Sequence, residues 1–534
     1  MGLRAAIAVH LRPELASRVA VVARLAAAMG VEAYLVGGTV RDLLLGRDGP
    51  DLDFVTVGDG LALATAIHRE LGGRLQRHSA FMTADVVDAD GVHLDVATAR
   101  QESYAAVAAL PAVRPAAALE DDLRRRDFTV NAMALRLVAP GDAGGNAERP
   151  EALDLGSLSA RGSGAIDPHG GRRDLAAGLL RVLHERSFFD DPTRVLRGAR
   201  FEARLGFRLT PESEAQARQA VAAGAFARLT GSRLRHELEL LLGAEPVPAA
   251  ALAGLERLQD LGVLAAVHPR LALDDAARQR LRTVAAEHAW YLAAGPGVAG
   301  GAGMAPAAGV SLGRAMRQAP SVRLWLLLLL ALAAGLAEPD RAELAERLLL
   351  AGDELRLMAG FGRRLAAAVP LLGAGALPHE VDAALAGLAD EELLLLAATG
   401  GADGSQPARQ TGQDGDAPVA KGTSRGPLES ASSFGTGGSV QVEPQVRSWV
   451  RRYLTGLRPL ALAIRGADLL AAGARPGPEV GNALRVTREA RLDGRIGAGE
   501  ELGFALACLH EARSGADGGR PVEGGEGMGR WERE

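Results

Sequence analysis

The 534-residue sequence has one cysteine, Cys508, so an internal disulfide and a zinc site built from several cysteines are both excluded. This cysteine usage fits a reducing compartment, and we expect a cytoplasmic protein with no disulfide partner. Lysine is equally scarce: Lys421 is the one lysine, and the other cationic side chains counted in the net charge are arginines. A formal net charge of -5 argues against a uniformly basic protein, so any nucleic-acid contact must come from local patches.

Long apolar runs are missing as well. The most apolar stretch, Leu324–Ala337, is too short to span a bilayer and predicts a buried helix. The N-terminal sequence MGLRAAIAVHLRPE has no long apolar core and no cleavage signature, so no signal peptide and no membrane association are expected. Aromatic residues make up 4% of the chain and hydrophobic residues 48%, mostly Ala and Leu, which favours helices over most of the length.

The chain is too long for one hydrophobic core, and its pattern changes along its length. Strands and helices alternate over the first 140 residues, whereas the sequence from Leu175 onward is helical, which predicts an α+β protein. The expected strands are residues 33–38, 52–57, 82–89, 92–98 and 131–138, with amphipathic helices at 14–30 and 60–72. The expected divisions are 1–155 (α/β), 166–245, 246–399 and 445–513 (helical), and 400–444 and 514–534 (disordered, being rich in small and polar residues).

The stretch AYLVGGTVRDLLLGRDGPDLDFVTV, residues 33–57, predicts a strand, two glycines, the start of a helix and a second strand. Asp51 and Asp53 alternate on the second strand and therefore face the same side. Two like charges side by side repel unless a cation lies between them, and carboxylate oxygens suit Mg²⁺. Gly38 lets the backbone approach a ligand closely, and Arg41 can reach a phosphate. Alone, this pattern also fits a strand–turn–helix with an incidental acidic turn.

Asp95 lies in GVHLDVATAR, in a strand that we expect to pair beside the strand of Asp51 and Asp53. It can complete a three-carboxylate cluster around two metal ions, or it can be an exposed strand aspartate without a role in chemistry.

The segment DDLRRRDFTVNAMAL carries arginines directly before Asp127, and Asn131 follows before an apolar strand. A triphosphate needs guanidinium forks such as Arg125 and Arg126, and a ribose needs acceptors and amides such as Asp127 and Asn131. A solvated basic turn is the alternative for this segment taken alone.

In FFDDPTRVLRGARFEARLGF, a helix is predicted after Pro192. Asp191 and Arg194 are three residues apart and are expected to share a face, which Arg197 and Arg200 continue. The Asp191 carboxylate accepts from an exocyclic amine and the Arg194 guanidinium donates to a ring nitrogen or carbonyl, a pattern that cytosine and adenine satisfy and guanine and uracil do not. A surface helix with ion pairs is the alternative.

The next predicted helix, SRLRHELELLL, is expected to brace this arginine row through Arg235 and Glu237.

The stretches LVGGTVRDLLLGRDGPDLDF, RRDFTVNAMAL, DPHGGRRDL, DDPTRVLRGARFEARLGF and SRLRHEL resemble, in order and spacing, the motifs of the class II nucleotidyltransferases. This family contains the tRNA CCA-adding enzymes and the bacterial poly(A) polymerases, and the resemblance covers roughly residues 34–242. The segment LRPLALAIRGADLLAAGARPGPEVGNALRVTREARLDGRI is similar to the tail of the family. The resemblance implies a nucleotidyltransferase head with a small mixed β-sheet, followed by an all-α neck, body and tail.

The resemblance also implies roles for particular residues. It assigns Asp51 and Asp53 to catalytic Mg²⁺ ions, with Asp95 as a third catalytic carboxylate. It assigns the nucleotide to ten residues: Gly38, Arg41, Arg125, Arg126, Asp127, Asn131, Asp191, Arg194, Arg197 and Arg200. The implied reaction is template-independent addition of C and A from CTP and ATP to the 3′ end of tRNA by two-metal phosphoryl transfer.

The chain departs from the family pattern at two places. Asp190 stands where the family usually has Glu, and Val107, Ala108 and Ala109 stand where close relatives have Pro-Gly, so that loop is expected to differ. Since the motifs are shared, an A-adding enzyme, a CC-adding enzyme and a poly(A) polymerase remain open. A catalytically inactive RNA-binding relative and a nucleotidyltransferase acting on a small molecule are further alternatives.

On this resemblance we expect Asp51→Ala to abolish nucleotide incorporation while leaving the fold intact, because it removes a metal-binding carboxylate and nothing from the core. Incorporation assays checked by circular dichroism measure both effects. Near-normal turnover of a folded variant would show that the metal assignment is wrong.

Overall fold

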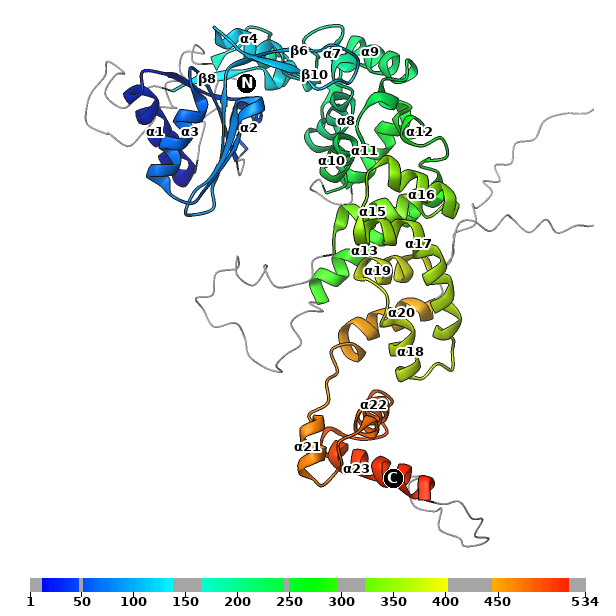
Figure 1. Cartoon of the computed structure of the whole chain (residues 1–534). Helices are drawn as coiled ribbons and strands as arrows, with labels where there is room; N and C mark the ends of the chain where they lie inside the picture. Colours follow the sequence, from blue (N-terminus) through cyan, green and yellow to red (C-terminus); the bar gives the residue numbers. More distant parts are fainter. Residues whose placement is uncertain are drawn as a thin grey trace, which may run out of the picture. The chain divides into compact units, whose positions relative to one another are not determined.

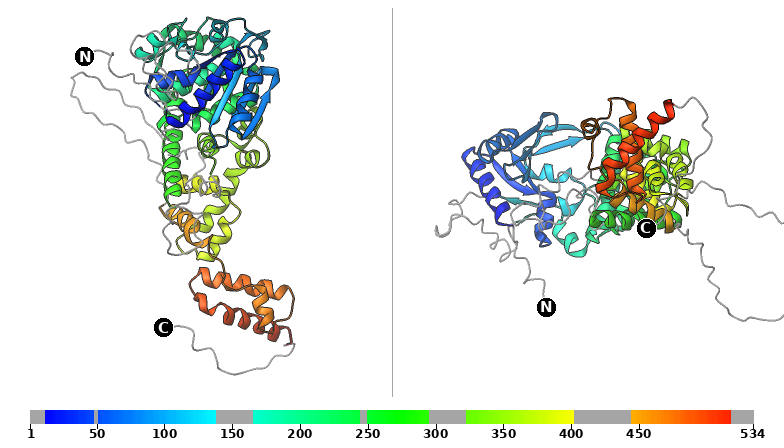
Figure 2. Two further views of the ribbon diagram at one scale, coloured as in Figure 1. Left: turned by 90° about the vertical axis from the view of Figure 1, so that its left-hand side faces the viewer. Right: turned by 90° about the horizontal axis from the view of Figure 1, so that it is seen from below.

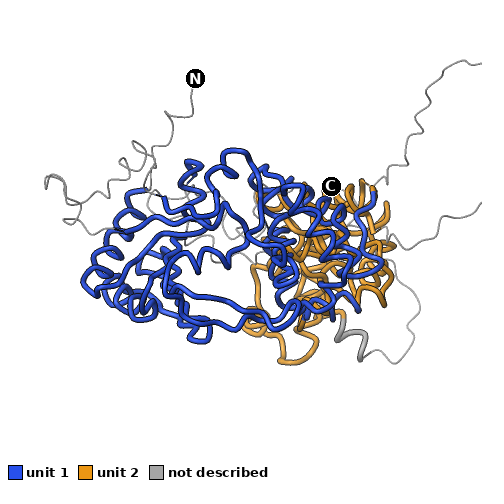
Figure 3. The backbone as a smooth tube through the Cα atoms, turned by 90° about the horizontal axis from the view of Figure 1, so that it is seen from above, with its two compact units in different colours: residues 1–274, 343–350 blue, residues 275–342, 351–534 orange. Residues whose placement is uncertain are grey.

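The computed structural model describes residues 12–47, 51–137, 165–243, 249–294, 322–401 and 444–517. The segments expected to be disordered, 400–444 and 514–534, lie largely outside these ranges. The chain divides into two compact units, residues 1–274 with 343–350 and residues 275–342 with 351–534 (Figure 3). None of the helices described has the length and apolar character that a membrane span needs.

The first unit contains a mixed sheet, which lies in the blue and cyan part of Figure 1. It has seven strands in the order β3-β4-β5-β2-β1-β8-β9. Its strands are β1 (Glu32–Val36), β2 (Asp51–Val57), β3 (Arg74–His78), β4 (Thr83–Val87), β5 (His93–Thr98), β8 (Ala134–Arg136) and β9 (Ala165–Ile166). β2 and β5 are parallel and the other neighbours are antiparallel. The prediction that the strand of Asp95 lies beside that of Asp51 is therefore confirmed.

Three helices of the sheet region are α1 (Pro13–Ala28), α2 (Gly37–Leu44) and α3 (Gly60–Leu71). α3 packs against β4 and β5, and α1 packs against α3, which can be followed in the blue part of Figure 2. Alternation along β2 turns Leu52 and Phe54 into the core and leaves Asp51 and Asp53 on the opposite face. The same alternation in β5 buries Leu94 and Val96.

Two of the strand predictions differ from the structure. Gly37 and Gly38 begin α2 and do not extend β1, which ends at Val36. Residues 129–131 form a 3₁₀ turn, so the expected strand over 131–138 shrinks to β8. The sequence pattern also missed β3, an edge strand whose RLQRH sequence is mostly polar and partly exposed.

The rest of the first unit is mainly helical. Its helices are α4 (Leu119–Arg124), α6 (Gly171–Ala177), α7 (Ser187–Asp190), α8 (Thr193–Leu205), α9 (Pro211–Ala222), α10 (Gly231–Leu242), α11 (Ala249–Asp260) and α12 (Val263–Val267), with the short strands β6 (Arg100–Ser103), β7 (Ala112–Pro115), β10 (Leu179–Leu180) and β11 (Arg208–Leu209). α8 begins directly after Pro192 as predicted and ends at Gly206, whose φ of 74° terminates the helix. α8 packs against α10 and α11.

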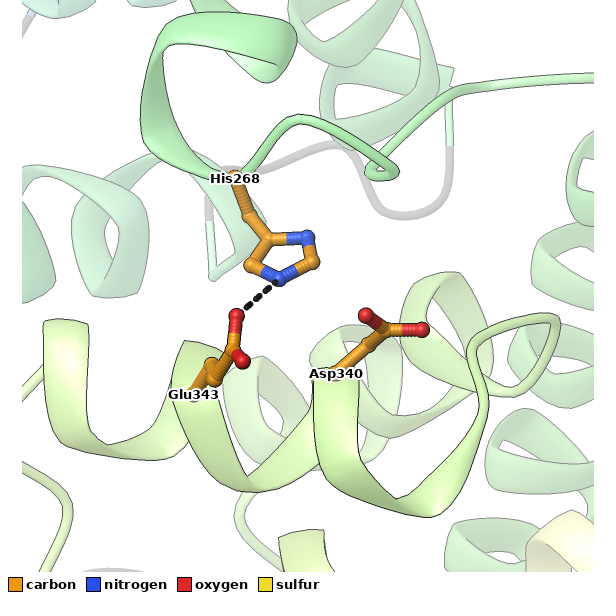
Figure 4. Close-up of side chains that lie close together, drawn as sticks. All are labelled: His268, Asp340 and Glu343. Atoms are coloured by element: carbon orange, nitrogen blue, oxygen red, sulfur yellow. Dashed lines mark ion pairs between the residues drawn. The ribbon is translucent and has the colours of Figure 1, made fainter.

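An ion pair lies near the end of the first unit. His268 follows α12, and its Nε2 lies 3.4 Å from Oε2 of Glu343 on α16 (Glu338–Arg347) (Figure 4). Asp340 and Glu343 are three residues apart and share a face of α16, the helix within which the boundary between the units falls.

The second unit is helical. Besides part of α16, it contains α13 (Asp275–Ala294), α15 (Leu324–Ala333), α17 (Gly352–Ala368), α18 (Pro378–Leu385), α19 (Asp390–Thr399), α20 (Pro444–Arg452), α21 (Gly466–Ala471), α22 (Pro478–Leu492) and α23 (Glu501–Asp517). The predicted buried apolar helix is confirmed as α15, where Leu326–Ala333 are all buried. α13 packs against α15 and α19, and the buried Glu287 of α13 accepts two hydrogen bonds of 3.0 Å from Arg451 of α20.

The aromatic cluster around Phe128 allows a prediction about stability. Phe128 is fully buried; it packs edge-to-face on Phe201 at 6.0 Å between ring centroids and lies tilted against Phe188 at 6.5 Å. We expect Phe128→Ala to lower the free energy of unfolding of the first unit by about 3–5 kcal/mol. Phe81→Ala is the matched control: Phe81 is 38% exposed, so less than about 1 kcal/mol is expected. Hydrogen exchange of β5 amides measures both, and equal effects would contradict the assigned core.

Candidate active site

A cleft of about 1140 Å³ opens in the first unit between the carboxylate face of the sheet and helices α8 and α10. Every site residue predicted from the sequence lines it: Gly38, Arg41, Asp51, Asp53, Asp95, Arg125, Arg126, Asp127, Asn131, Asp191, Arg194, Arg197 and Arg200. The fold thus brings together four segments that are separated by up to about 160 residues of sequence. Tyr104, Arg233, His236 and Glu237 also line the cleft.

The carboxylates sit in register on neighbouring strands. Asp53 of β2 lies opposite Asp95 of β5, and Asp95 lies opposite Asp85 of β4. Thr39 on α2 fixes the end of β2, because its hydroxyl accepts from the Asp53 backbone N–H at 3.0 Å and donates to the Asp53 carboxylate at 3.3 Å. The helix following β1 therefore positions the carboxylate on β2.

Gly37 allows α2 to lie close to Asp53 and Arg126. Its φ is +68°, and a Cβ there would lie 2.8 Å from a terminal nitrogen of Arg126 and 3.5 Å from the Asp53 carboxylate. A side chain at this position would strain the backbone and push the end of the Arg126 side chain aside.

Negative charge accumulates at this floor. Burial raises the pKa of Asp53, although the Arg126 guanidinium and the hydrogen bonds from Thr39 oppose the shift. Burial and the neighbouring Asp53, Asp85 and Asp51 carboxylates raise the pKa of Asp95 to about 6. Two adjacent acids with raised pKa values mark a place where a cation would relieve electrostatic repulsion.

A divalent cation fits this donor set. Asp51, Asp53 and Asp95 offer only carboxylate oxygens, which are the ligands of hard cations. In the described part of the chain, the ligand oxygens of these three residues do not all lie within 4.8 Å of one another. Their side chains would therefore have to rotate toward a shared ion.

Two buried acids that the sequence analysis missed hold the arginines before Asp127. Asp122 is fully buried; it accepts from Arg125 at 2.7 Å and from Arg126 at 3.1 Å, and Glu102 accepts from Arg125 at 2.9 Å. Burial alone would raise the pKa of Asp122, but the two guanidinium groups hold it below its ordinary value. The sequence DDLRRRD already contained a clue to this role of Asp122, since a buried arginine needs an acidic partner.

A buried polar chain runs from α2 to α8. Arg41 donates to both oxygens of Asp42 at 2.9 Å and to Oδ1 of Asn131 at 2.7 Å. Nδ2 of Asn131 donates to Asp127 at 2.9 Å, and Arg197 donates to the same carboxylate at 2.6–2.8 Å. Although Asp127 is buried, Arg197 and the Asn131 amide hold its pKa well below the usual range.

Asp191 and Arg194 both line the cleft, but not as neighbours on one helix face. Asp191 is extended (φ −139°, ψ 96°) and precedes α8, so the predicted helical i,i+3 relation is wrong. The buried Arg194 side chain donates to Ser187 Oγ at 2.5 Å and to the Arg125 carbonyl at 2.7 Å. The Pro192 that starts the helix also keeps Asp191 outside it.

Of the two residues on α10 that were predicted to contact the arginines of α8, one does so. Glu237 accepts from Arg197 at 3.4 Å and from Arg200 at 3.3 Å, and both guanidinium groups lie within 5.7 Å of the Phe201 ring centroid. Arg235 points elsewhere and pairs with Glu239, one turn along α10. The inward-facing arginine of this helix is Arg233, which donates to Asp191 at 2.6 Å.

Paired strand carboxylates facing a bank of guanidinium groups are the arrangement on which the resemblance to a nucleotidyltransferase head rests. Residues 33–181 match the family described as the poly A polymerase head domain. The resemblance of this region to the class II nucleotidyltransferases is thereby confirmed.

Similar proteins carry several activities in their names. An A-adding tRNA nucleotidyltransferase of Halalkalibacterium halodurans is 41% identical over 44% of this chain and 50% of its own length. A CC-adding tRNA nucleotidyltransferase of Deinococcus radiodurans is 40% identical over 42% of this chain and 53% of its own. These matches therefore span about half the length of either relative.

The likeness in structure extends further along the chain. A CCA-adding enzyme of Thermotoga maritima, solved in complex with tRNA, superposes with a TM-score of 0.60 over 95% of this chain and 97% of its own, at 24% identity. The α+β fold with a helical remainder is therefore confirmed.

The raised pKa of Asp95 predicts a pH-dependent stability. Its native pKa of about 6 exceeds the unfolded value of about 3.9, so ionisation costs more in the folded state, and the residue destabilises the fold as pH rises through 4–6. We therefore expect Asp95→Asn to stabilise the metal-free protein at pH 7.5. The gain should be small, because Asp95 keeps solvent contact, and smaller still at pH 4.

Urea unfolding in EDTA at both pH values measures this difference. Asp121→Asn is the control, because Asp121 accepts a hydrogen bond from Gln101 and does not line the cleft. A gain of equal size at pH 4 and pH 7.5 would contradict the electrostatic origin.

Proposed function

We propose that this protein adds C and A residues to the 3′ end of tRNA, using CTP and ATP and no template. The observation that carries the proposal is the joint placement, in one cleft, of strand carboxylates, buried guanidinium groups and the pair Asp191 and Arg194. Relatives named as A-adding, CC-adding and CCA-adding enzymes support the class of reaction.

The carboxylates Asp51 and Asp53 hold the cations in this proposal, with Asp95 completing the set, and Mg²⁺ fits an all-oxygen donor set best. Bound divalent cations would supply an activated 3′-hydroxyl and charge neutralisation of the departing pyrophosphate. The protein itself then orients the reactants: Gly38 admits the triphosphate close to the backbone, and Arg41 and Arg126 contribute positive charge beside it.

Base choice falls to Asp191 and Arg194. A carboxylate oxygen accepts from the exocyclic amine of cytosine or adenine, and a guanidinium donates to the adjacent ring nitrogen. The carbonyl that guanine and uracil present at the amine position meets an acceptor there and is rejected. Arg197 and Arg200 are fixed by Glu237 and line the same pocket.

We also propose that the helical regions serve as neck (166–245), body (246–399) and tail (445–513) and contact the tRNA by its backbone and shape, as expected for helical RNA. An enzyme acting on tRNA with CTP and ATP would work in the cytoplasm, which agrees with the cysteine content.

A second candidate is addition of A alone, which the 41% identity to an A-adding relative favours. We expect tRNA lacking its CCA end to be extended with CTP alone by two residues and with CTP plus ATP by three. Denaturing gels of each reaction with MgCl₂ measure this. Extension only of tRNA ending in CC, and only with ATP, would replace the proposal by the A-adding activity, and repeated A addition would indicate a poly(A) polymerase.

A further inference from the structure

Asp191 is held by one oxygen only. Its Oδ1 accepts from the Thr193 backbone N–H at 3.0 Å, from the Thr193 hydroxyl at 2.6 Å and from Arg233 at 2.6 Å. The structure records no hydrogen bond to Oδ2 from the described residues, while the residue lines the cleft. One oxygen is therefore anchored, and the other is left without a hydrogen-bond partner among the described residues.

Arg233 also donates a hydrogen bond to the backbone of a different segment. Its other terminal nitrogen donates to the Ala108 carbonyl at 3.2 Å, and the Ala108 N–H donates to the Phe189 carbonyl at 3.1 Å. Ala108 has a φ of +60°, one of three such non-glycine residues in the described ranges. A left-handed alanine costs free energy that its surroundings must offset, and these two contacts do so.

Arg233 thus connects two parts of the cleft wall. The segment 104–111 lines the cleft at Tyr104 and Pro111, and Asp191 stands at the start of α8. Arg233 itself is half-buried on α10, with 22% of its side chain exposed.

We propose that Arg233 is a positioning residue for base selection: it fixes Oδ1 of Asp191 so that Oδ2 accepts the base amine, and it ties that carboxylate to the 104–111 segment. The inference deepens the proposed function and rests on it. Without the guanidinium only Thr193 holds Oδ1, so the carboxylate is fixed less firmly. Water can then take the place of the amine or bridge to a carbonyl, so the preference for amine-bearing bases falls.

The test compares Arg233→Met, which keeps the length of the side chain, with Arg235→Met, a matched control on the same helix whose partner is Glu239 outside the cleft. For each protein, kcat/KM is measured with CTP, ATP, UTP and GTP on acceptor tRNA. We expect Arg233→Met to lower the ratio of CTP over UTP at least tenfold, within the range that one hydrogen-bonded base contact supplies, and Arg235→Met to change it less than about twofold.

Arg233→Lys separates the two contacts of the guanidinium. A lysine keeps a charged donor for Asp191 but lacks the fork that also reaches Ala108. We expect it to restore part of the nucleotide preference while amide exchange over residues 104–111 stays faster than in the wild type. It also stands in for Arg233→Met if that variant does not fold.

The outcomes distinguish the two proposals. If the wild type adds no nucleotide to any tRNA, the proposed function fails, and equilibrium binding of the four nucleotides still tests the role of Arg233. An unchanged nucleotide preference in a folded Arg233→Met protein overturns the inference. Unchanged amide exchange at residues 104–111 overturns the link to that segment.

Discussion

The ion pair between Asp127 and Arg197 is the contact on which the arrangement of the cleft depends. Asp127 is buried, with 8% of its side chain exposed, and a buried charge is tolerated only when its counter-charge and hydrogen bonds are in place. Asp127 therefore engages Asn131, Asn131 engages Arg41, and Arg197 reaches Glu237. Each member of this chain hydrogen-bonds to the next, so the sheet, α8 and α10 are held at one spacing. The side of the cleft with Arg41 and the side with Arg197 are therefore parts of one network.

Much of this region could be predicted from the sequence, because its signals are local. Alternation in LDFVTV and HLDVAT put Asp51, Asp53 and Asp95 on one face of neighbouring strands, and the parallel pairing of β2 with β5 follows that expectation. Pro192 predicted where α8 begins. The predicted site residues all line one cleft, and their individual roles stay a prediction.

The features that the sequence did not predict depend on tertiary contacts, which a periodic pattern of residues does not reveal. Residues three apart suggested a helical pair, yet the φ and ψ angles of Asp191 place it before the helix. On α10, Arg233 and Arg235 are two residues apart and so face different directions, and only the packing of α10 on α8 decides which faces the cleft. Asp122 and Glu102 went unnoticed because an acid beside arginines looks like a solvated turn until burial is known. The edge strand β3 has too few apolar residues to be recognised.

The positive wall of the cleft consists of guanidinium groups, and the sequence offers almost no alternative to them. A guanidinium stays protonated at any pH a cell reaches, so its attraction for a polyanion is not a titratable property. It also presents no amine to an acetyltransferase, which leaves lysine acetylation with a single target, Lys421, far along the chain from the cleft residues. The positive charge of these arginines is thus fixed by the sequence, and neither acidification nor lysine acetylation changes it.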